Sequence, residues 1–298
     1  MSGILKAFLA VFSFGTRFRG PVKPDSSCMY SFALAMQPLV GLLIGFAAAL
    51  LPLFTTAFFR DLQGLVLFTS GIYLFLLEWL TRFDNLHAFD AACRSLAGAD
   101  AKPEERLARL GQPGSSPCTA LLVGLKLMLM YMIFLRAALF GKMLLLLFIL
   151  VAVPFLGRIA MLFAYPSSPG KQPGSVRLAI KLLWALAALI LLAFILGLLR
   201  AYGHDFFSFR SMKLTMSGFS LDRNGSGGVP LLIAIVSLGI QDTFLFLASG
   251  YLAVLYWNTE AQFKLETKPA PCFAGAICET AELSAMIVFL ILTNELID

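Results

Sequence analysis

The sequence predicts an all-α integral membrane protein that crosses the bilayer several times. Hydrophobic residues make up 59% of the 298 residues and charged residues only 13%, whereas globular domains contain about 45–50% and about 25%. Apolar runs long enough to cross a bilayer recur along the whole chain, and the mean hydropathy is +0.85. This composition excludes a secreted disulfide scaffold, a disordered chain and a soluble nucleic-acid-binding protein. We expect one integral membrane domain over residues 1–298.

Seven windows are apolar over the length that a membrane-spanning helix needs, about 20 residues. The sequence therefore predicts about seven transmembrane helices. The sixth is long, and Gly239 and Gly250 are its candidate bend positions. The apolar stretch 4–14 is too short to span and predicts an interfacial or partly buried segment. The seven windows are 31–54, 63–80, 119–135, 143–164, 178–199, 230–257 and 273–294.

The basic residues predict the orientation of these helices. With the N-terminus in the cytoplasm, the inside segments carry 13 of the 23 Lys and Arg residues and the outside loops carry 7. Cytoplasmic loops of membrane proteins carry an excess of Lys and Arg, so this bias predicts a cytoplasmic N-terminus. The same rule accounts for the net charge of +6, and no nucleic-acid partner is expected. The five cysteines form no CxxC pair and are interpreted as free thiols.

The segment 82–118 predicts two short amphipathic helices that lie along the cytoplasmic membrane surface. It is too long for a simple hairpin connection, and its apolar residues recur at helical spacing, as at Phe83, Leu86 and Phe89. The following loop, 166–174, is rich in Pro and Gly and predicts irregular structure.

Two pairs of acidic residues are candidate sites. Asp84 and Asp90 share a face of the first short helix with His87, where carboxylates could hold Mg²⁺ or simply form a solvated surface. Glu279 and Glu282 lie three residues apart at the start of the last span. Two carboxylates on one face of an apolar helix repel each other unless a cation or a shared proton compensates them. The alternative places both glutamates in the headgroup layer, where they ionise freely.

Charged residues inside other spans are also candidates. Arg158 lies in the window 143–164, where a guanidinium group pairs with a carboxylate or a phosphate, or else reaches back to the interface. Asp242 lies in the sixth window and is interpreted as an internal ion partner of Lys126 or Arg158. No GxGxxG or Walker motif is present, and Ser115 and Ser116 have no base beside them, so nucleophilic catalysis has no support.

Five segments of the chain follow one another in an order that resembles one enzyme family. Over residues 8–290 they are similar to the motifs of the cobalamin synthases, the adenosylcobinamide-GDP ribazoletransferases. The third lies where that family has an Asp-Gly-Leu-Ala-Asp motif, and the fifth matches its closing Gly-Ala-x-x-Glu-x-x-Glu. The segments are Ala10-Val-Phe-Ser-Phe-Gly-Thr-Arg-Phe-Arg19, Gln37-Pro-Leu-Val-Gly-Leu-Leu-Ile-Gly45, Asp84-Asn-Leu-His-Ala-Phe-Asp90, Gly157-Arg-Ile-Ala-Met161 and Gly275-Ala-Ile-Cys-Glu-Thr-Ala-Glu282.

The resemblance implies a magnesium-dependent transferase that acts in the last steps of cobalamin biosynthesis, in the bacterial cell inner membrane. The 5′ oxygen of α-ribazole, or of its 5′-phosphate, would attack the cobinamide-linked phosphorus of adenosylcobinamide-GDP, and GMP would leave. The resemblance implies Mg²⁺ on the catalytic carboxylates Asp84, Asp90, Glu279 and Glu282. Arg158 would bind a substrate phosphate.

Departures from the family motifs leave alternatives open. Arg82, Asn85 and Ala88 stand where the family has a His, a Gly and its second Asp. The chain could therefore be a drifted or inactive homologue, either a scaffold for other corrinoid-assembly enzymes or a transferase for another diphosphate-linked substrate. A small transporter that uses intramembrane charges is a weaker alternative, because the sequence shows no inverted repeat. The sequence does not decide between a monomer and a homo-oligomer.

Overall fold

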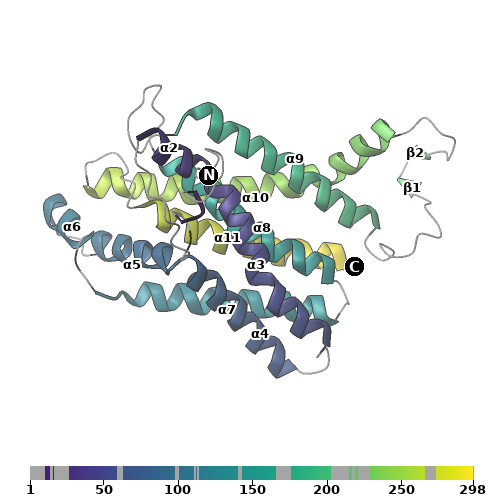
Figure 1. Cartoon of the computed structure of the whole chain (residues 1–298), viewed down its shortest axis with the longest axis horizontal. Helices are drawn as coiled ribbons and strands as arrows, with labels where there is room; N and C mark the ends of the chain where they lie inside the picture. The colour runs from purple at the N-terminus through teal and green to yellow at the C-terminus, as the bar shows by residue number, and fades with distance from the viewer. Residues whose placement is uncertain are drawn as a thin grey trace, which may run out of the picture.

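The computed structural model of the chain is a bundle of long α-helices (Figure 1). Within its described residues, the only other regular structure is a two-residue antiparallel strand pair, in which Thr215 lies opposite Ser220. The predicted interfacial stretch 4–14 lies mostly outside the described residues. The structure describes residues 11–13, 16, 27–58, 63–97, 101–110, 112, 114–139, 143–165, 176–202, 215–216, 219–220, 228–265 and 273–297.

Six of the seven apolar windows each fall on one helix, and the first, 31–54, covers the end of α2 and most of α3. Helices α5 and α6 lie within the segment 82–118. Their position along the membrane surface stays a prediction. The elements are α2 (Ser27–Ala35), α3 (Gln37–Phe58), α4 (Gln63–Leu80), α5 (Asp84–Leu96), α6 (Pro103–Leu110), α7 (Pro117–Leu139), α8 (Met143–Ala164), α9 (Leu178–Tyr202), β1 (Thr215–Met216), β2 (Phe219–Ser220), α10 (Gly228–Leu265) and α11 (Ala274–Ile297).

The length and composition of these helices are those of a membrane protein. Among the described residues, five helices contain a window long and apolar enough to cross a bilayer, and the number is six if α4 and α5 count as one bent span. The five are α3, α7, α8, α9 and α11. The all-helical fold class is therefore confirmed, and the length and composition of these helices support a membrane protein. The expected count of seven spans stays a prediction.

Helix α8 lies at the centre of the bundle. Its apolar window is 78% buried inside the protein, compared with 22% for the window of α9, so α8 faces protein and α9 mostly faces outward. Helices α3 and α11 pack directly on α8. At Gly41 of α3 the two backbones are so close that a Cβ would lie 2.6 Å from the carbonyl oxygen of Pro154. Such small-residue contacts are the usual way in which helices associate within a bilayer.

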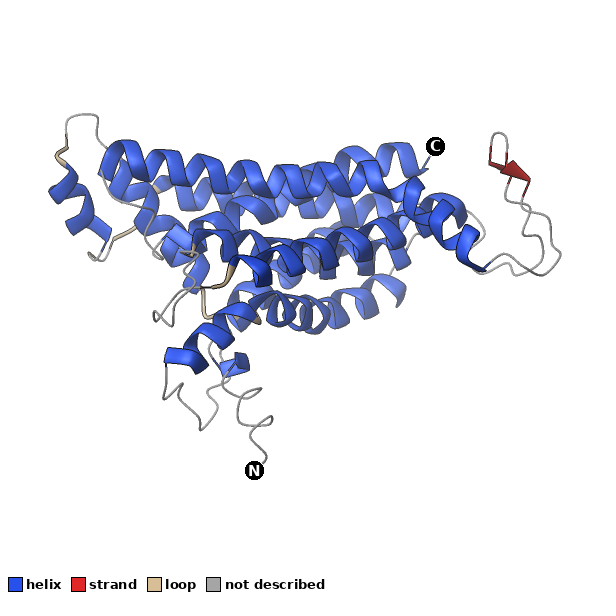
Figure 2. Cartoon of the chain, turned by 90° about the horizontal axis from the view of Figure 1, so that it is seen from above, coloured by secondary structure: helices blue, strands red, loops and turns tan. Residues whose placement is uncertain are grey.

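The two ends of the bundle differ. Helices α5 and α6 lie at one end, and the β1–β2 pair lies at the opposite end, beyond α9 and α10 (Figure 1). The view turned by 90° shows the same separation, with the long helices side by side between the two ends (Figure 2). The end that carries α5 and α6 also contains the beginnings of α7 and α11, so their first turns lie near the segment 82–116.

The close contact between α9 and α10 predicts a strong effect of one methyl group. Gly239 of α10 lies against α9, where a Cβ would be 2.0 Å from the carbonyl oxygen of Ala193. We expect Gly239→Ala to push the helices apart and to lower the free energy of unfolding by about 1–3 kcal/mol or more. Thermal unfolding in detergent micelles measures this change.

Gly124 of α7 supplies the matched control. A Cβ at this position meets nothing within 4 Å. Gly124→Ala should therefore be neutral, or should stabilise the protein by up to about 1 kcal/mol because alanine favours the helix. Equal destabilisation by the two variants would contradict the packing of α9 on α10.

Candidate functional site

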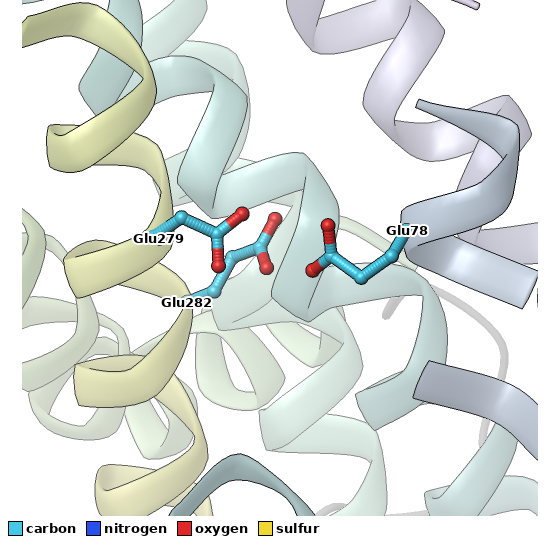
Figure 3. Close-up of side chains that lie close together, drawn as sticks. All are labelled: Glu78, Glu279 and Glu282. Carbon is cyan, nitrogen blue, oxygen red and sulfur yellow. The ribbon is translucent and has the colours of Figure 1, made fainter. Parts of the chain in front are cut away.

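Three glutamates and one lysine form a buried charged cluster. Glu279 and Glu282 of α11 point toward Glu78 of α4, and one carboxylate oxygen from each lies within 4.8 Å of the others (Figure 3). Lys126 of α7 donates hydrogen bonds to Glu279 and to Glu282, the latter at 2.7 Å, and its Nζ lies 3.7 Å from Glu78 Oε1. All four residues are buried, and the most exposed, Glu78, is 9% exposed. Three carboxylates therefore share one ammonium group inside the bundle.

Helix α11 presents its two glutamates on one face because they are three residues apart, as the sequence predicted. Gly157 of α8 makes room for one of them. A Cβ at Gly157 would lie 2.6 Å from Cγ and 3.0 Å from Oε1 of Glu282. Gly275 has a similar role at the start of α11, where a Cβ would lie 2.5 Å from Ala88 Cβ of α5. Gly157 therefore lets α8 pack against Glu282, and Gly275 lets the start of α11 pack against α5.

A tight turn at the end of α4 fixes the third glutamate. The N–H of Phe83 donates to the carbonyl oxygen of Glu78 at 2.8 Å, and the N–H of Arg82 donates to that of Trp79 at 3.2 Å. These two bonds form a Schellman motif, which usually has glycine at the position of Arg82. Arg82 and Phe83 instead have φ of 61° and 60°, in the left-handed region that non-glycine residues rarely adopt. The turn redirects the chain by 86° into α5 and holds Glu78 two residues before the end of α4.

The protein leaves part of this cluster unsatisfied. Glu78 Oε2 is buried and accepts no hydrogen bond from any described residue. Among the described residues, the donor to Glu282 Oε1 is the thiol of Cys278, at 3.6 Å, and a thiol is a weak donor. Buried polar atoms almost always have a hydrogen-bond partner, so an exception calls for a ligand, a proton or another explanation. Three carboxylates around one ammonium group likewise indicate that a cation or a proton can bind there.

The cluster fits a hard divalent cation. Such ions prefer carboxylate oxygens, and two ligands of one ion lie at most two metal–oxygen distances apart, about 4.2 Å for Mg²⁺ and about 5 Å for Ca²⁺. The three carboxylate oxygens lie within 4.8 Å of one another, which is close enough to share Ca²⁺. Sharing Mg²⁺ needs these distances to be no longer than about 4.2 Å, which is at most a small contraction. Glu78, Glu279 and Glu282 are therefore the residues that could hold a metal.

Arg158 is buried among the helices of the bundle. Its side chain is buried on α8, and Nη1 donates to Gln37 Oε1 of α3 at 2.8 Å. It follows Gly157 directly in the sequence, so it projects from a neighbouring face of α8 while Gly157 contacts Glu282. Arg158, which the sequence predicts to bind a phosphate, thus lies on the helix that packs against Glu282.

The four predicted carboxylates do not all come together. Glu279 and Glu282 lie side by side, whereas Asp84 is exposed in the first turn of α5. Asp90 is buried, but its Oδ1 accepts from the N–H of Ser116 at 2.5 Å and from Thr119 Oγ1 at 2.7 Å, and its Oδ2 accepts from Arg94 at 2.9 Å. Oδ1 of Asp90 therefore ties α5 to the start of α7, while Oδ2 pairs with Arg94 within α5. The assignment of Asp84 and Asp90 as metal ligands stays a prediction that this geometry does not support.

The electrostatics of Asp90 agree with a structural role. Burial by itself would raise its pKa, but hydrogen bonds from Thr119, from the N–H of Ser116 and from Arg94 lower the pKa below its usual range. A carboxyl group with a lowered folded-state pKa stabilises the fold above its unfolded value, about 3.9, and loses that contribution as the pH falls through the folded value. The contact of α5 with α7 is therefore expected to persist throughout the neutral range.

Sequence reasoning missed two members of the cluster. Glu78 was not singled out, and Lys126 was considered only as a partner of Asp242; the structure pairs Lys126 with the three glutamates instead. A usable signal was present, because a lone ionisable residue within an apolar window is a functional candidate in its own right. The described cysteines, Cys93, Cys118 and Cys278, are free thiols, as expected.

No protein-family model matches the chain, and no curated protein or solved structure is significantly similar to it. The resemblance to the cobalamin synthases therefore stays a prediction that rests on the order of the motifs alone.

The contacts of Asp90 predict a stability effect that separates it from Asp84. We expect Asp90→Ala to lower the free energy of unfolding by about 1–3 kcal/mol, because it removes the acceptor for the Ser116 N–H and the partner of Arg94. The start of α7 should also loosen, which faster maleimide labelling of Cys118 would report. Asp84→Ala, at an exposed position, should change stability by no more than about 0.5 kcal/mol. Equal effects at the two positions would contradict the clamp between α5 and α7.

Proposed function

We propose that this protein is a membrane-embedded, cation-dependent transferase that acts on a diphosphate-linked substrate at the cluster of Glu78, Glu279 and Glu282. The observation that carries the proposal is the buried surplus of carboxylates, one of whose oxygens has no hydrogen-bond partner among the described residues. Acidic residues inside a bilayer are costly, so their presence favours function over structure. Transfer at a diphosphate depends mainly on positioning and on neutralising charge, which is what such a site provides.

The depth of the cluster supports an enzyme that meets substrates from one side of the membrane. Glu78 lies two residues before the end of α4, and Glu279 is five residues beyond the first residue of α11. At about 1.5 Å of rise per residue, both lie within roughly 10 Å of the helix ends. A polar substrate at the membrane surface can reach that depth without entering the middle of the bilayer.

The specific reaction that we propose is that of adenosylcobinamide-GDP ribazoletransferase. A ribose hydroxyl oxygen of α-ribazole, or of its 5′-phosphate, forms a bond to the cobinamide-linked phosphorus, the bond to GMP breaks, and the proton of the attacking hydroxyl passes to solvent. The carboxylates would hold Mg²⁺, which when bound neutralises the diphosphate charge. Arg158, oriented by Gln37, would donate to a phosphate oxygen. The five sequence motifs described above support this substrate. The proposed partners of the protein are corrinoid-assembly enzymes or a second copy of the chain.

A drifted transferase for another diphosphate-linked substrate is the second candidate. It is favoured by the positions of Asp84 and Asp90, since neither belongs to the three-glutamate group. The two candidates share the cation site and differ only in the substrate that they accept.

The first test is turnover by the lipid-reconstituted protein supplied with adenosylcobinamide-GDP, α-ribazole and Mg²⁺. We expect release of GMP with formation of cobalamin, and loss of both on addition of EDTA. Glu279→Gln and Glu282→Gln should each lower kcat by about 100-fold, because each removes a charged cation ligand. Absence of product beside an active cobalamin synthase in the same lipid would exclude the corrinoid substrate.

Glu260→Gln is the matched control for the glutamate variants. Glu260 lies on α10 and pairs with Lys264 at 2.7 Å, away from the cluster, so its replacement should leave turnover unchanged. Full activity in Glu279→Gln would show that catalysis takes place elsewhere.

We further propose that the protein lies in the bacterial inner membrane with the α5–α6 end in the cytoplasm. Cys118 tests this orientation because it is exposed at the start of α7, at that end. A membrane-impermeant maleimide should label it in inverted membrane vesicles and not in intact spheroplasts, with Cys118→Ser identifying the labelled site. Labelling from outside the spheroplasts would reverse the proposed topology.

A further inference from the structure

We propose that Lys126 is an exchangeable counter-cation, which holds the three-glutamate cluster in its metal-free form and is displaced when a divalent cation binds. The inference concerns how the site is occupied. It rests on the proposed function only in sharing its residues, and cation binding does not depend on which substrate the protein accepts.

The position of the ammonium group is the first argument. Lys126 Nζ lies 2.7 Å from Glu282 Oε2, donates also to Glu279, and lies 3.7 Å from the nearest oxygen of Glu78. It therefore occupies the space between the three carboxylates, where a shared cation would bind. An ammonium group has three donors, yet within the described part of the chain the hydrogen bonds from Lys126 go to the two glutamates of α11.

The unpartnered oxygen of Glu78 is the second and independent argument. Glu78 is about nine-tenths buried, its carboxylate points into the cluster (Figure 3), and its Oε2 has no hydrogen-bond partner among the described residues. The lysine thus fills the site incompletely. A metal ion that binds Glu78 together with Glu279 and Glu282 would satisfy the oxygen that the ammonium group leaves without a partner.

Charge and mobility give the direction of the exchange. When all three carboxylates are ionised, they exceed the one ammonium group by two negative charges, which a divalent cation cancels while the lysine remains nearby. The carboxylates are held in place by the turn after α4 and by the close packing of Gly157. Lysine is a point charge on a flexible four-carbon stem, so it is the member that can move aside.

The experiment measures Mn²⁺ binding to the purified full-length protein in lipid nanodiscs, from the electron paramagnetic resonance signal of the free ion. We expect saturable binding by the wild type. Lys126→Met removes the competitor and should bind Mn²⁺ at least about tenfold more tightly. Glu78→Gln retains the pairing of Lys126 with α11 but loses one ligand, and should bind about tenfold or more weakly. Lys181→Met is the matched control, since Lys181 is also buried but donates to the carbonyl oxygen of Tyr165; it should bind as the wild type does.

Three results would overturn the inference. They are no saturable Mn²⁺ binding by the wild type, wild-type affinity in Glu78→Gln, and unchanged or weaker affinity in a folded Lys126→Met. If Lys126→Met does not fold, the comparison of the wild type with Glu78→Gln still decides whether the cluster binds the cation. Mn²⁺ binding without turnover of adenosylcobinamide-GDP would exclude the corrinoid substrate and leave the exchange intact. Turnover that persists in EDTA, without Mn²⁺ binding, would exclude both the exchange and the cation dependence of the proposed transferase.

Discussion

The fold depends on the need to keep opposite charges together in a medium of low dielectric constant. An ion buried without a partner costs several kcal/mol, so the carboxylates of α4 and α11 and the ammonium group of α7 have to meet. This requirement sets how the three helices approach one another. Helix α8 packs against these charges, and Gly157 on it leaves the space that Glu282 occupies. Non-polar packing, as between α3 and α8, completes the rest of the bundle.

Two acidic sites in the molecule show opposite degrees of satisfaction. Asp90 has donors on both carboxylate oxygens, and such a fully bonded group fastens two helices together. The cluster at Glu78 has more acceptors than donors, and an incompletely bonded buried network is poor at holding a structure together. The contrast explains why we assign a structural role to the first and a binding role to the second.

The sequence predicts the helices well, because the thickness of the bilayer directly determines the length of an apolar run. It also predicts the pairing of Glu279 with Glu282, which follows from helical spacing alone. It does not reveal that Glu78 and Lys126 join them, since these residues lie far apart in the chain and only the packing of α4, α7 and α11 unites them. The expected convergence of Asp84 failed to appear because Asn85, one position further along α5, is the residue that faces Gly275 of α11. A shift of one residue on a helix changes the face by about 100°.

The turn between α4 and α5 has a mechanical consequence. The same backbone carbonyl, that of Glu78, belongs to a residue of the buried cluster and accepts the bond that closes the turn. Two consecutive non-glycine residues in the left-handed region leave this turn little freedom to adjust its shape. Helix α5 therefore cannot tilt or slide without disturbing the carboxylate that precedes it. A movement of α5 is therefore coupled through this turn to Glu78 and so to the buried cluster.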